Sequence, residues 1–138
     1  MTKIYILTKI IVEGYYNRYY TPMIDTGAEA NMCKYNCLPD SKWKKLKTPL
    51  IVTGFNNEGS MILHKARNIK IQIWDKILTI EEIYSYEFTN KDILLGIPFS
   101  DKFYPHSITK THWWFTTSCN KKVGAKRVSN KIKKIHHG

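Results

Sequence analysis

The sequence has few cysteines, no long hydrophobic run and no acidic residue in its last part. Its three cysteines (Cys33, Cys37 and Cys119) cannot all pair, which argues against the disulfide framework of a small secreted protein. No stretch approaches the ~18 consecutive apolar residues that a membrane-spanning helix needs. The apolar run from Ile4 to Val12 is interrupted by Lys9 and lacks a small-residue cleavage site, so we do not expect a signal peptide. These absences favour a protein of a reducing compartment with no membrane partner.

No spacing of possible ligands fits a structural zinc site. Cys33 and Cys37 are separated by three residues, and no second pair of cysteines or histidines lies at zinc-finger distance. His106, His112 and Cys119 match none of the common ligand patterns. We therefore expect no metal and no cofactor.

The acidic residues end at Asp101, although the chain as a whole is strongly basic. Its 138 residues include 22 Lys and Arg and 11 Asp and Glu, and the resulting net charge of +11 suggests an anionic partner such as nucleic acid. Eight basic residues and no acidic residue lie beyond Ile108, so residues 1–108 carry a net charge of only +3. We predict one folded domain over residues 1–108 and a flexible basic tail or linker over residues 109–138.

The hydrophobic pattern of the first hundred residues predicts β structure. Ile69, Ile71 and Ile73 alternate with other side chains, as in a strand with one buried face. Turn-forming residues separate this strand from several other short apolar runs. We expect strands over residues 4–12, 18–24, 51–53, 60–63, 69–74, 77–83 and 92–96. Only residues 41–46 and 97–103 look helical, which favours an all-β barrel or sandwich.

The run Met23-Ile24-Asp25-Thr26-Gly27-Ala28 places a carboxylate directly after an apolar strand. Apolar neighbours raise the cost of the ionised form of Asp25, and Gly27 permits a tight turn and a close approach of the backbone to a ligand. The Thr26 hydroxyl can hold such a turn in place. Asp-Thr-Gly is also ordinary turn chemistry in any β protein, so the three residues alone leave a purely structural reading open.

Two later segments give this motif a context. Residues 54–59 form a polar, glycine-bounded hairpin tip, and Ile93-Leu94-Leu95-Gly96 is a short apolar run closed by glycine. In this order the three segments resemble the retropepsins, the retroviral-type aspartic proteases. Residues 31–33, 38–39, 43–46 and 92–99 are similar to the protease segment of plant pararetrovirus polyproteins, with badnaviruses and the rice tungro bacilliform virus as the nearest resemblance. The resemblance covers roughly residues 3–105.

The resemblance implies an all-β, retropepsin-like closed barrel of the acid protease fold, with one short C-terminal helix, that is active as a symmetric homodimer. It implies that Asp25, Thr26 and Gly27 are catalytic, with one Asp25 from each subunit activating a water molecule. Substrate contacts would come from Ala28 and from Gly54, Phe55, Asn56 and Asn57 of a flap. The substrate would be a viral polyprotein, from which the protein is released in the host cytoplasm.

Two other functions stay open at this point. The basic tail together with Trp113, Trp114 and Phe115 could form a nucleic-acid-binding module, or at least make a weak nucleic-acid contact through residues 109–138. Against this, the folded part is nearly neutral and carries no RNA-recognition signature. We favour packing or a linker role for these aromatic residues. A catalytically inactive retropepsin-like dimerisation scaffold would carry the same motif.

Overall fold

The computed structural model describes residues 3–6, 8–11, 18–52, 61–73, 75–88 and 90–128. Within these ranges the chain is mostly β-strand, with one short α-helix and three turns of 3-10 helix. None of the described helices is long and apolar enough to cross a membrane. The all-β expectation is confirmed.

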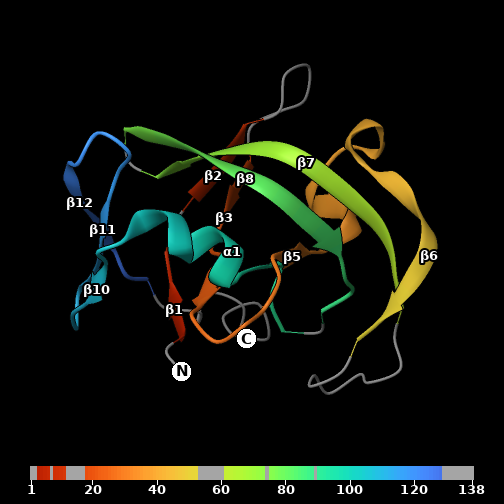
Figure 1. Ribbon diagram of the computed structural model, residues 1–138, viewed down its shortest axis with the longest axis horizontal. Helices are drawn as coiled ribbons and strands as arrows, with labels where there is room; N and C mark the ends of the chain where they lie inside the picture. Colours follow the sequence, from red (N-terminus) through yellow and green to blue (C-terminus); the bar gives the residue numbers. More distant parts are fainter. Residues whose placement is uncertain are drawn as a thin grey trace, which may run out of the picture.

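The described strands form a large curled sheet and a small sheet (Figure 1). The large sheet contains β1 (Lys3–Tyr5), β2 (Thr8–Ile11), β3 (Arg18–Tyr20), β4 (Met23–Asp25), β5 (Met32–Cys33), β6 (Lys44–Ile51), β7 (Met61–Ile73), β8 (Lys76–Ser85) and β9 (Ile93–Leu95). Its strand order is β1-β4-β9-β5-β8-β7-β2-β3, and β6 pairs with the first part of β7. The small sheet contains β10 (Ser107–Ile108), β11 (His112–Thr116) and β12 (Lys122–Lys126).

The long strands β7 and β8 form the main curved layer of the molecule. Ile69, Ile71 and Ile73 are each at most 2% exposed, while Lys70 between them is exposed. This confirms the predicted strand with one buried face, because alternate side chains of a strand point to opposite sides. Asp75 turns the chain into β8, which pairs antiparallel with β7 from Lys76 onward.

Two runs that the sequence predicts as single strands are each split in two. The run over residues 4–12 becomes β1 and β2, and the run over residues 18–24 becomes β3 and β4. Pro22 lies in the second break, where its carbonyl accepts the Ile6 N–H at 3.3 Å. Proline has no N–H to offer a neighbouring strand, so a break at this residue is expected.

The short strands β4, β9 and β5 combine parallel and antiparallel pairing. β4 runs parallel to β9, with Ile24 opposite Leu95, and β9 pairs antiparallel with β5. β5 in turn runs parallel to β8. All three residues of β9 are buried, which confirms the prediction of a fully buried strand within residues 92–96.

The predicted helix over residues 97–103 is present as α1 (Ile97–Ser100) followed by the 3-10 turn η3 (Asp101–Phe103). The predicted helix over residues 41–46 is wrong beyond Lys42. A 3-10 turn η1 (Tyr35–Cys37) and a second, η2 (Asp40–Lys42), precede the strand β6, which begins at Lys44. Pairing of β6 with β7 overrides the weak helical preference of this lysine-rich segment.

The structure differs from the expectation of a flexible tail for residues 109–128. Trp113 and Phe115 of β11 are fully buried, and Ala125 of β12 is 1% exposed, within the same core as Ile4 and Phe99. The Trp113 and Phe115 rings stack with their centroids 4.5 Å apart. The alternation of apolar and polar residues in β11 therefore outweighs the polar composition of its surroundings. Packing of these aromatic residues is confirmed.

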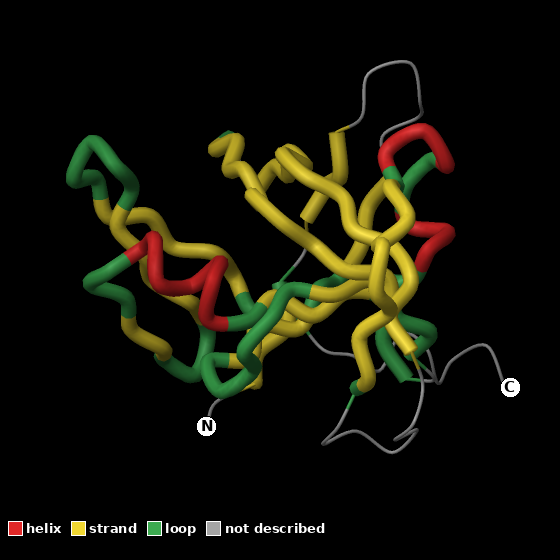
Figure 2. The backbone as a smooth tube through the Cα atoms, turned by 45° about the vertical axis from the view of Figure 1, so that its right-hand side comes forward, coloured by secondary structure: helices red, strands yellow, loops and turns green. Residues whose placement is uncertain are grey.

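The small sheet lies at one end of the molecule beside α1 and η3 (Figures 1 and 2). Its last residues reach the N-terminal strand, since Arg127 bridges to Ile6 and the Val128 N–H donates to the Tyr5 carbonyl at 2.8 Å. The folded unit therefore continues to residue 128. Residues 129–138 of the predicted tail lie outside the described residues.

Candidate active site

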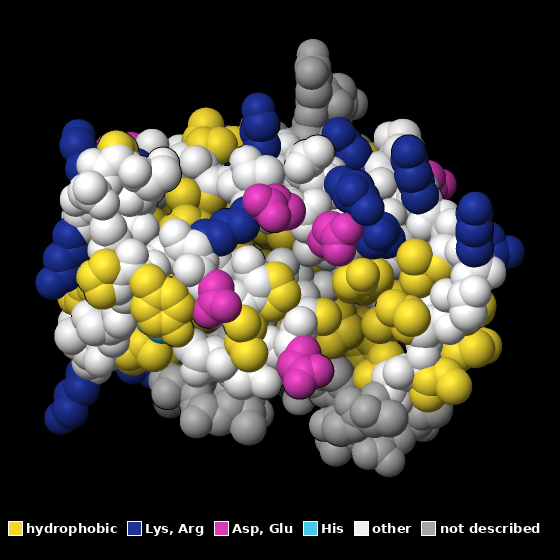
Figure 3. Space-filling view, in the orientation of Figure 1, with side chains coloured by type: hydrophobic (Ala, Val, Ile, Leu, Met, Phe, Trp, Pro, Cys, Tyr) yellow, Lys and Arg dark blue, Asp and Glu magenta, His cyan; other side chains and the backbone are white. Residues whose placement is uncertain are grey.

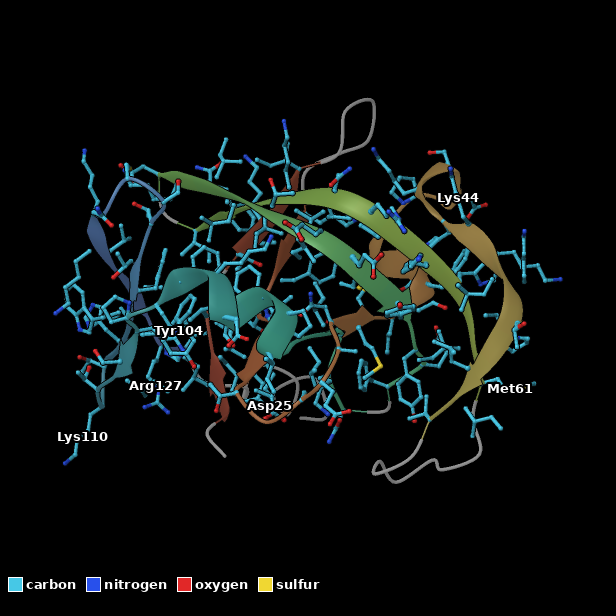
Figure 4. All side chains as sticks on the ribbon, viewed as in Figure 1. Asp25, Lys44, Met61, Tyr104, Lys110 and Arg127 are labelled. Atoms are coloured by element: carbon cyan, nitrogen blue, oxygen red, sulfur yellow. The ribbon has the colours of Figure 1, made fainter. Side chains whose placement is uncertain are left out.

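Asp25 is the last residue of β4, where the strand leaves the sheet at the lower edge of the view in Figure 4. Its neighbours in the strand, Met23 and Ile24, are both buried. On one side β4 pairs with β1, which places Lys3 opposite Asp25, and on the other side it pairs with β9. Three strands therefore fix the backbone position of this carboxylate.

The Asp25 side chain is only 7% exposed, which is uncommon for a carboxylate. The Gly27 N–H donates to its Oδ1 atom at 2.9 Å, and the Ala28 N–H donates to its backbone carbonyl at 3.2 Å. None of the ion pairs formed by described residues involves Asp25. Asp25 is thus a nearly buried carboxylate held by a backbone N–H at the point where the chain leaves the strand.

The residues after Asp25 form the turn that the motif predicts. Thr26 and Ala28 are partly buried, and Gly27 is exposed, so a ligand above Asp25 can approach the backbone at Gly27. We call residues 25–31 the Asp25 loop. The hydrogen bond from Gly27 to the carboxylate is the turn chemistry expected of Asp-Thr-Gly in any protein, so it does not by itself distinguish a catalytic from a structural aspartate.

The Asp25 loop rests on the junction between β9 and α1. The Ile97 N–H donates to the Ala28 carbonyl at 2.8 Å, and the Gly96 N–H donates to the Asn31 Oδ1 atom at 2.9 Å. A Cβ atom on Gly96 would lie 2.5 Å from the Ala28 carbonyl oxygen and 2.7 Å from that of Ala30. The late Leu-Leu-Gly segment thus supports the loop directly, and glycine is needed because the two backbones touch.

An apolar cluster, separate from the main core, adjoins the Asp25 loop. Met23, Met32 and Leu94 lie near the loop, and Val52 and Ile62 come from the ends of β6 and β7. The cluster also contains the aromatic residues Tyr86 and Phe88, and the partly buried Ala28 packs against it. The paired strands β6 and β7 up to Ile51 and Met61 are here called the β6–β7 arm. The apolar cluster connects the Asp25 loop with this arm.

The strands β6 and β7 pair antiparallel up to Ile51 and Met61 and so bracket residues 53–60. The candidate flap residues Gly54, Phe55, Asn56 and Asn57 lie outside the described residues. The end of the arm next to residues 53–60 exposes apolar side chains, with Ile51 73% and Met61 56% exposed. Figure 3 shows hydrophobic side chains gathered over this arm, and Figure 4 marks its two ends with Lys44 and Met61.

The cysteines and histidines of the described ranges are scattered. No three His, Cys, Asp or Glu side chains among the described residues are grouped as a metal site would need. Cys33 and Cys37 are both buried, and burial together with a hydrogen bond to Cys37 raises the pKa of the Cys33 thiol. A protonated thiol is a poor metal ligand.

Sequence reasoning misses Asn31 and Ile97 as supports of the loop. Asn31 appears there only within a family-like run, and no spacing rule connects it with Gly96, 65 residues later. An asparagine between a glycine turn and a short apolar strand is a weak signal by itself, and only the folded chain joins the two segments.

Comparison with known proteins identifies a family and a relative. Residues 2–137 match the family described as Cauliflower mosaic virus peptidase (A3). The chain is 37% identical over 106 residues to a putative enzymatic polyprotein of cassava vein mosaic virus. That match covers 76% of this chain and 16% of the polyprotein, so the chain spans about one sixth of its relative's length.

Two solved structures share the fold. The retroviral protease-like domain of Ddi1 from Leishmania major aligns with a TM-score of 0.63 at 10% identity, covering 94% of this chain and 97% of that domain. A retropepsin-like aspartic protease from Rickettsia conorii aligns with a TM-score of 0.52 at 16% identity, covering 89% of this chain and 84% of the other. At such low identity the two structures establish the acid protease fold.

Proposed function

This chain belongs to the cauliflower mosaic virus peptidase family (A3), the retropepsins of plant pararetroviruses, and we propose that it is an aspartic endopeptidase that cleaves a viral polyprotein. The observation that carries the proposal is the position of Asp25. The carboxylate is almost buried, takes part in none of the ion pairs found among the described side chains and ends a strand beside an apolar cluster.

The proposed site needs two copies of the chain. The sequence contains a single Asp-Thr-Gly, and hydrolysis by this class of enzyme needs two carboxylates around one water molecule. A symmetric homodimer supplies both as Asp25 and its partner-subunit equivalent. Two carboxylates this close share one proton, because ionising both would place like charges side by side.

The shared proton divides the roles of the two carboxyl groups. The ionised carboxylate takes a proton from the water molecule as the water attacks the scissile carbonyl carbon. The protonated carboxyl group donates its proton to the carbonyl oxygen, and a tetrahedral gem-diol forms. The carboxyl group that took the proton of the water then gives it to the amide nitrogen, while the other carboxylate takes back a proton from a hydroxyl group of the gem-diol. The C–N bond breaks to leave a carboxylic acid and an amine, and one shared proton remains on the two carboxyl groups. Asp25 is the residue to which we assign this chemistry.

The neighbouring residues take supporting roles in the proposal. Thr26 holds the loop and links it with the loop of the partner subunit, while Gly27 and Ala28 contact the backbone of the peptide. Gly54, Phe55, Asn56 and Asn57 form the flap that covers the peptide and excludes water. The pairing of β6 with β7 on either side of residues 53–60 supports a hairpin at this place.

We propose a peptide substrate with apolar residues on both sides of the cleaved bond. A buried apolar cluster that includes Met23, Met32 and Leu94 adjoins the Asp25 loop, and an apolar environment of this kind favours apolar side chains. We further propose that the protease domain extends from the N-terminal strand to residue 128, because β11 and β12 complete its core. In this proposal the domain is released from a polyprotein in the host cytoplasm.

The test is cleavage of a polyprotein fragment by the wild-type chain and by Asp25→Asn. Asparagine preserves the shape of the side chain but cannot hold the shared proton, so we expect cleavage to be lost while circular dichroism stays unchanged. A wild-type chain that folds but never cleaves would indicate an inactive scaffold. Cleavage by Asp25→Asn at the wild-type rate would refute the assignment of Asp25.

A further inference from the structure

Asn31 closes the Asp25 loop at its far end, directly before β5. Its side chain is 3% exposed, although asparagine usually lies at the surface. In Figure 1 the loop from β4 to β5 passes beneath α1. A buried amide at this point must satisfy both a donor and an acceptor group.

The Asn31 amide joins the loop to two other elements. Its Oδ1 atom accepts the N–H of Gly96 at 2.9 Å, at the junction of β9 and α1, and this bond is fully buried. Its Nδ2 atom donates to the Glu82 carbonyl of β8 at 3.1 Å. The backbone carbonyl of Asn31 accepts the Tyr84 N–H at 3.0 Å. One side chain therefore binds β8 and β9 to the end of the loop.

The loop is thereby anchored on both sides of its turn. Asp25 is held by strand pairing with β1 and β9, and the Ala28 carbonyl is held by the Ile97 N–H. Without the amide of Asn31, the Gly96 N–H and the Glu82 carbonyl lose their partners inside the protein, which is costly. The loop could relieve that cost only by moving, and Asp25 would move with it.

We propose that Asn31 is a positioning residue that sets the place of the Asp25 carboxylate relative to its copy in the dimer. This inference rests on the proposed function, because the proton shared by two carboxylates depends on their separation. A displacement of about 1 Å can lower a catalytic rate roughly 100-fold. Asn31 touches neither substrate nor water in this role and acts through the loop.

The amide suits this role because it offers a donor and an acceptor together. Leucine at this position has a similar shape and offers neither. An ionised aspartate accepts the Gly96 N–H but turns an oxygen toward the Glu82 carbonyl, whereas a protonated aspartic acid can donate an O–H to that carbonyl. Asn31→Asp should therefore restore the native contacts at acid pH and break one of them at neutral pH.

Other charged groups lie around Asn31 and enter the interpretation of that pH dependence. Asn31 lines a groove of about 380 Å³ together with residues of β7, β8 and η3. The charged side chains facing this groove from those elements are Arg67, Glu81, Glu82 and Lys102. Arg67 pairs with Glu82 at 3.1 Å and Lys102 with Glu81 at 2.9 Å. Asp25 and Glu29 are the acidic residues of the loop itself.

The experiment measures kcat and KM of the full chain per active site, with sites counted by titration with a statine-type inhibitor, from pH 4 to pH 8. We expect Asn31→Leu to lower kcat per titrated site at least tenfold at every pH, with KM within twofold of the wild type. We expect Asn31→Asp to approach the wild-type kcat at acid pH and to lose at least tenfold relative to the wild type as pH rises. Thr8→Val is the control, because it removes from β2 a buried hydroxyl group that has no hydrogen-bond partner in the described part of the chain.

A wild-type kcat per titrated site in Asn31→Leu would overturn the proposal, because the residue would then affect only the folded fraction. If Asn31→Leu does not fold, the pH profile of Asn31→Asp tests the proposal instead. A ratio of the Asn31→Asp kcat to the wild-type kcat that stays constant with pH would also overturn the proposal. Failure of the proposed function would be seen in a different result. Either the wild-type chain would not cleave the polyprotein fragment, or the Asp25→Asn variant would still cleave it.

Discussion

Gly96 offers a direct perturbation of the proposed site, because its replacement by alanine adds one methyl group beneath the Asp25 loop. The added Cβ atom would lie 2.5 Å from the Ala28 carbonyl oxygen and 2.7 Å from that of Ala30, where ordinary contact begins near 3.4 Å. Gly96 has φ −102° and ψ −158°, which any residue adopts, so the effect is one of packing alone. Since both contacts are backbone atoms, the loop must retreat by roughly 0.7–0.9 Å.

The expected size follows from this retreat. Overpacking of this kind costs about 1–3 kcal/mol. Weakening of the bonds from Ile97 to Ala28 and from Gly96 to Asn31 adds about 0.5–1.5 kcal/mol each. The reduced freedom of the unfolded chain offsets about 0.4–1 kcal/mol. We expect Gly96→Ala to lose about 2–4 kcal/mol of unfolding free energy and, since Asp25 shifts with the loop, on the order of 100-fold in kcat per titrated site.

Urea unfolding and peptide cleavage measure the two effects, and Gly124→Ala is the matched control. A Cβ atom on Gly124 would lie 2.6 Å from the Trp114 ring, a side chain on the small sheet. That variant should lose stability while its kcat per titrated site stays at the wild-type value. Wild-type stability and wild-type kcat in Gly96→Ala would refute the view that Gly96 supports the loop.

Three further predictions concern the rest of the fold. Trp113→Ala removes a fully buried side chain and should cost about 3–5 kcal/mol in urea unfolding, whereas an unchanged midpoint would contradict the assignment of β11 to the core. Cys119 is exposed and its pKa is lowered, chiefly by the Thr117 hydroxyl group, whereas the pKa of the buried Cys33 thiol is raised. Iodoacetamide at pH 8 should therefore label Cys119 before Cys33, as followed by mass spectrometry. Labelling of Cys33 before Cys119 would contradict this prediction. Burial and the nearby Cys37 raise the pKa of Tyr20 from 10.0 to about 12, so the folded protein holds the phenol proton more tightly than the unfolded chain does. The stability that this proton contributes should be lost as pH rises from about 10 to 12. In unfolding experiments over this pH range, a Tyr20→Phe variant should lack that loss.

The sequence predicts strands well where one physical signal dominates. The alternation of Ile69, Ile71 and Ile73 predicts the last part of β7, and the apolar run closed by Gly96 predicts the buried strand β9. The sequence predicts secondary structure less well where contacts between distant segments determine it. Lys44–Ile51 looks partly helical but pairs with β7, and the small sheet is hidden by its lysine-rich composition until Trp113 and Phe115 are seen in the core.

The candidate site shows the same division. Asp25, Thr26 and Gly27 are visible in sequence because carboxylate, hydroxyl and glycine in adjacent positions are a recognisable combination. The support beneath them is not, because Asn31, Gly96 and Ile97 come together through the pairing of β9 with both β4 and β5. Contacts between segments 65 residues apart leave no local pattern to read.

The central claim is that one active site is built from two Asp25 side chains. Native mass spectrometry with a statine-type inhibitor tests this directly, because the hydroxyl group of the inhibitor replaces the catalytic water between the two carboxyl groups. We predict a complex of two chains with one inhibitor molecule and no such complex with Asp25→Asn. A complex of one chain with one inhibitor molecule would contradict the shared site.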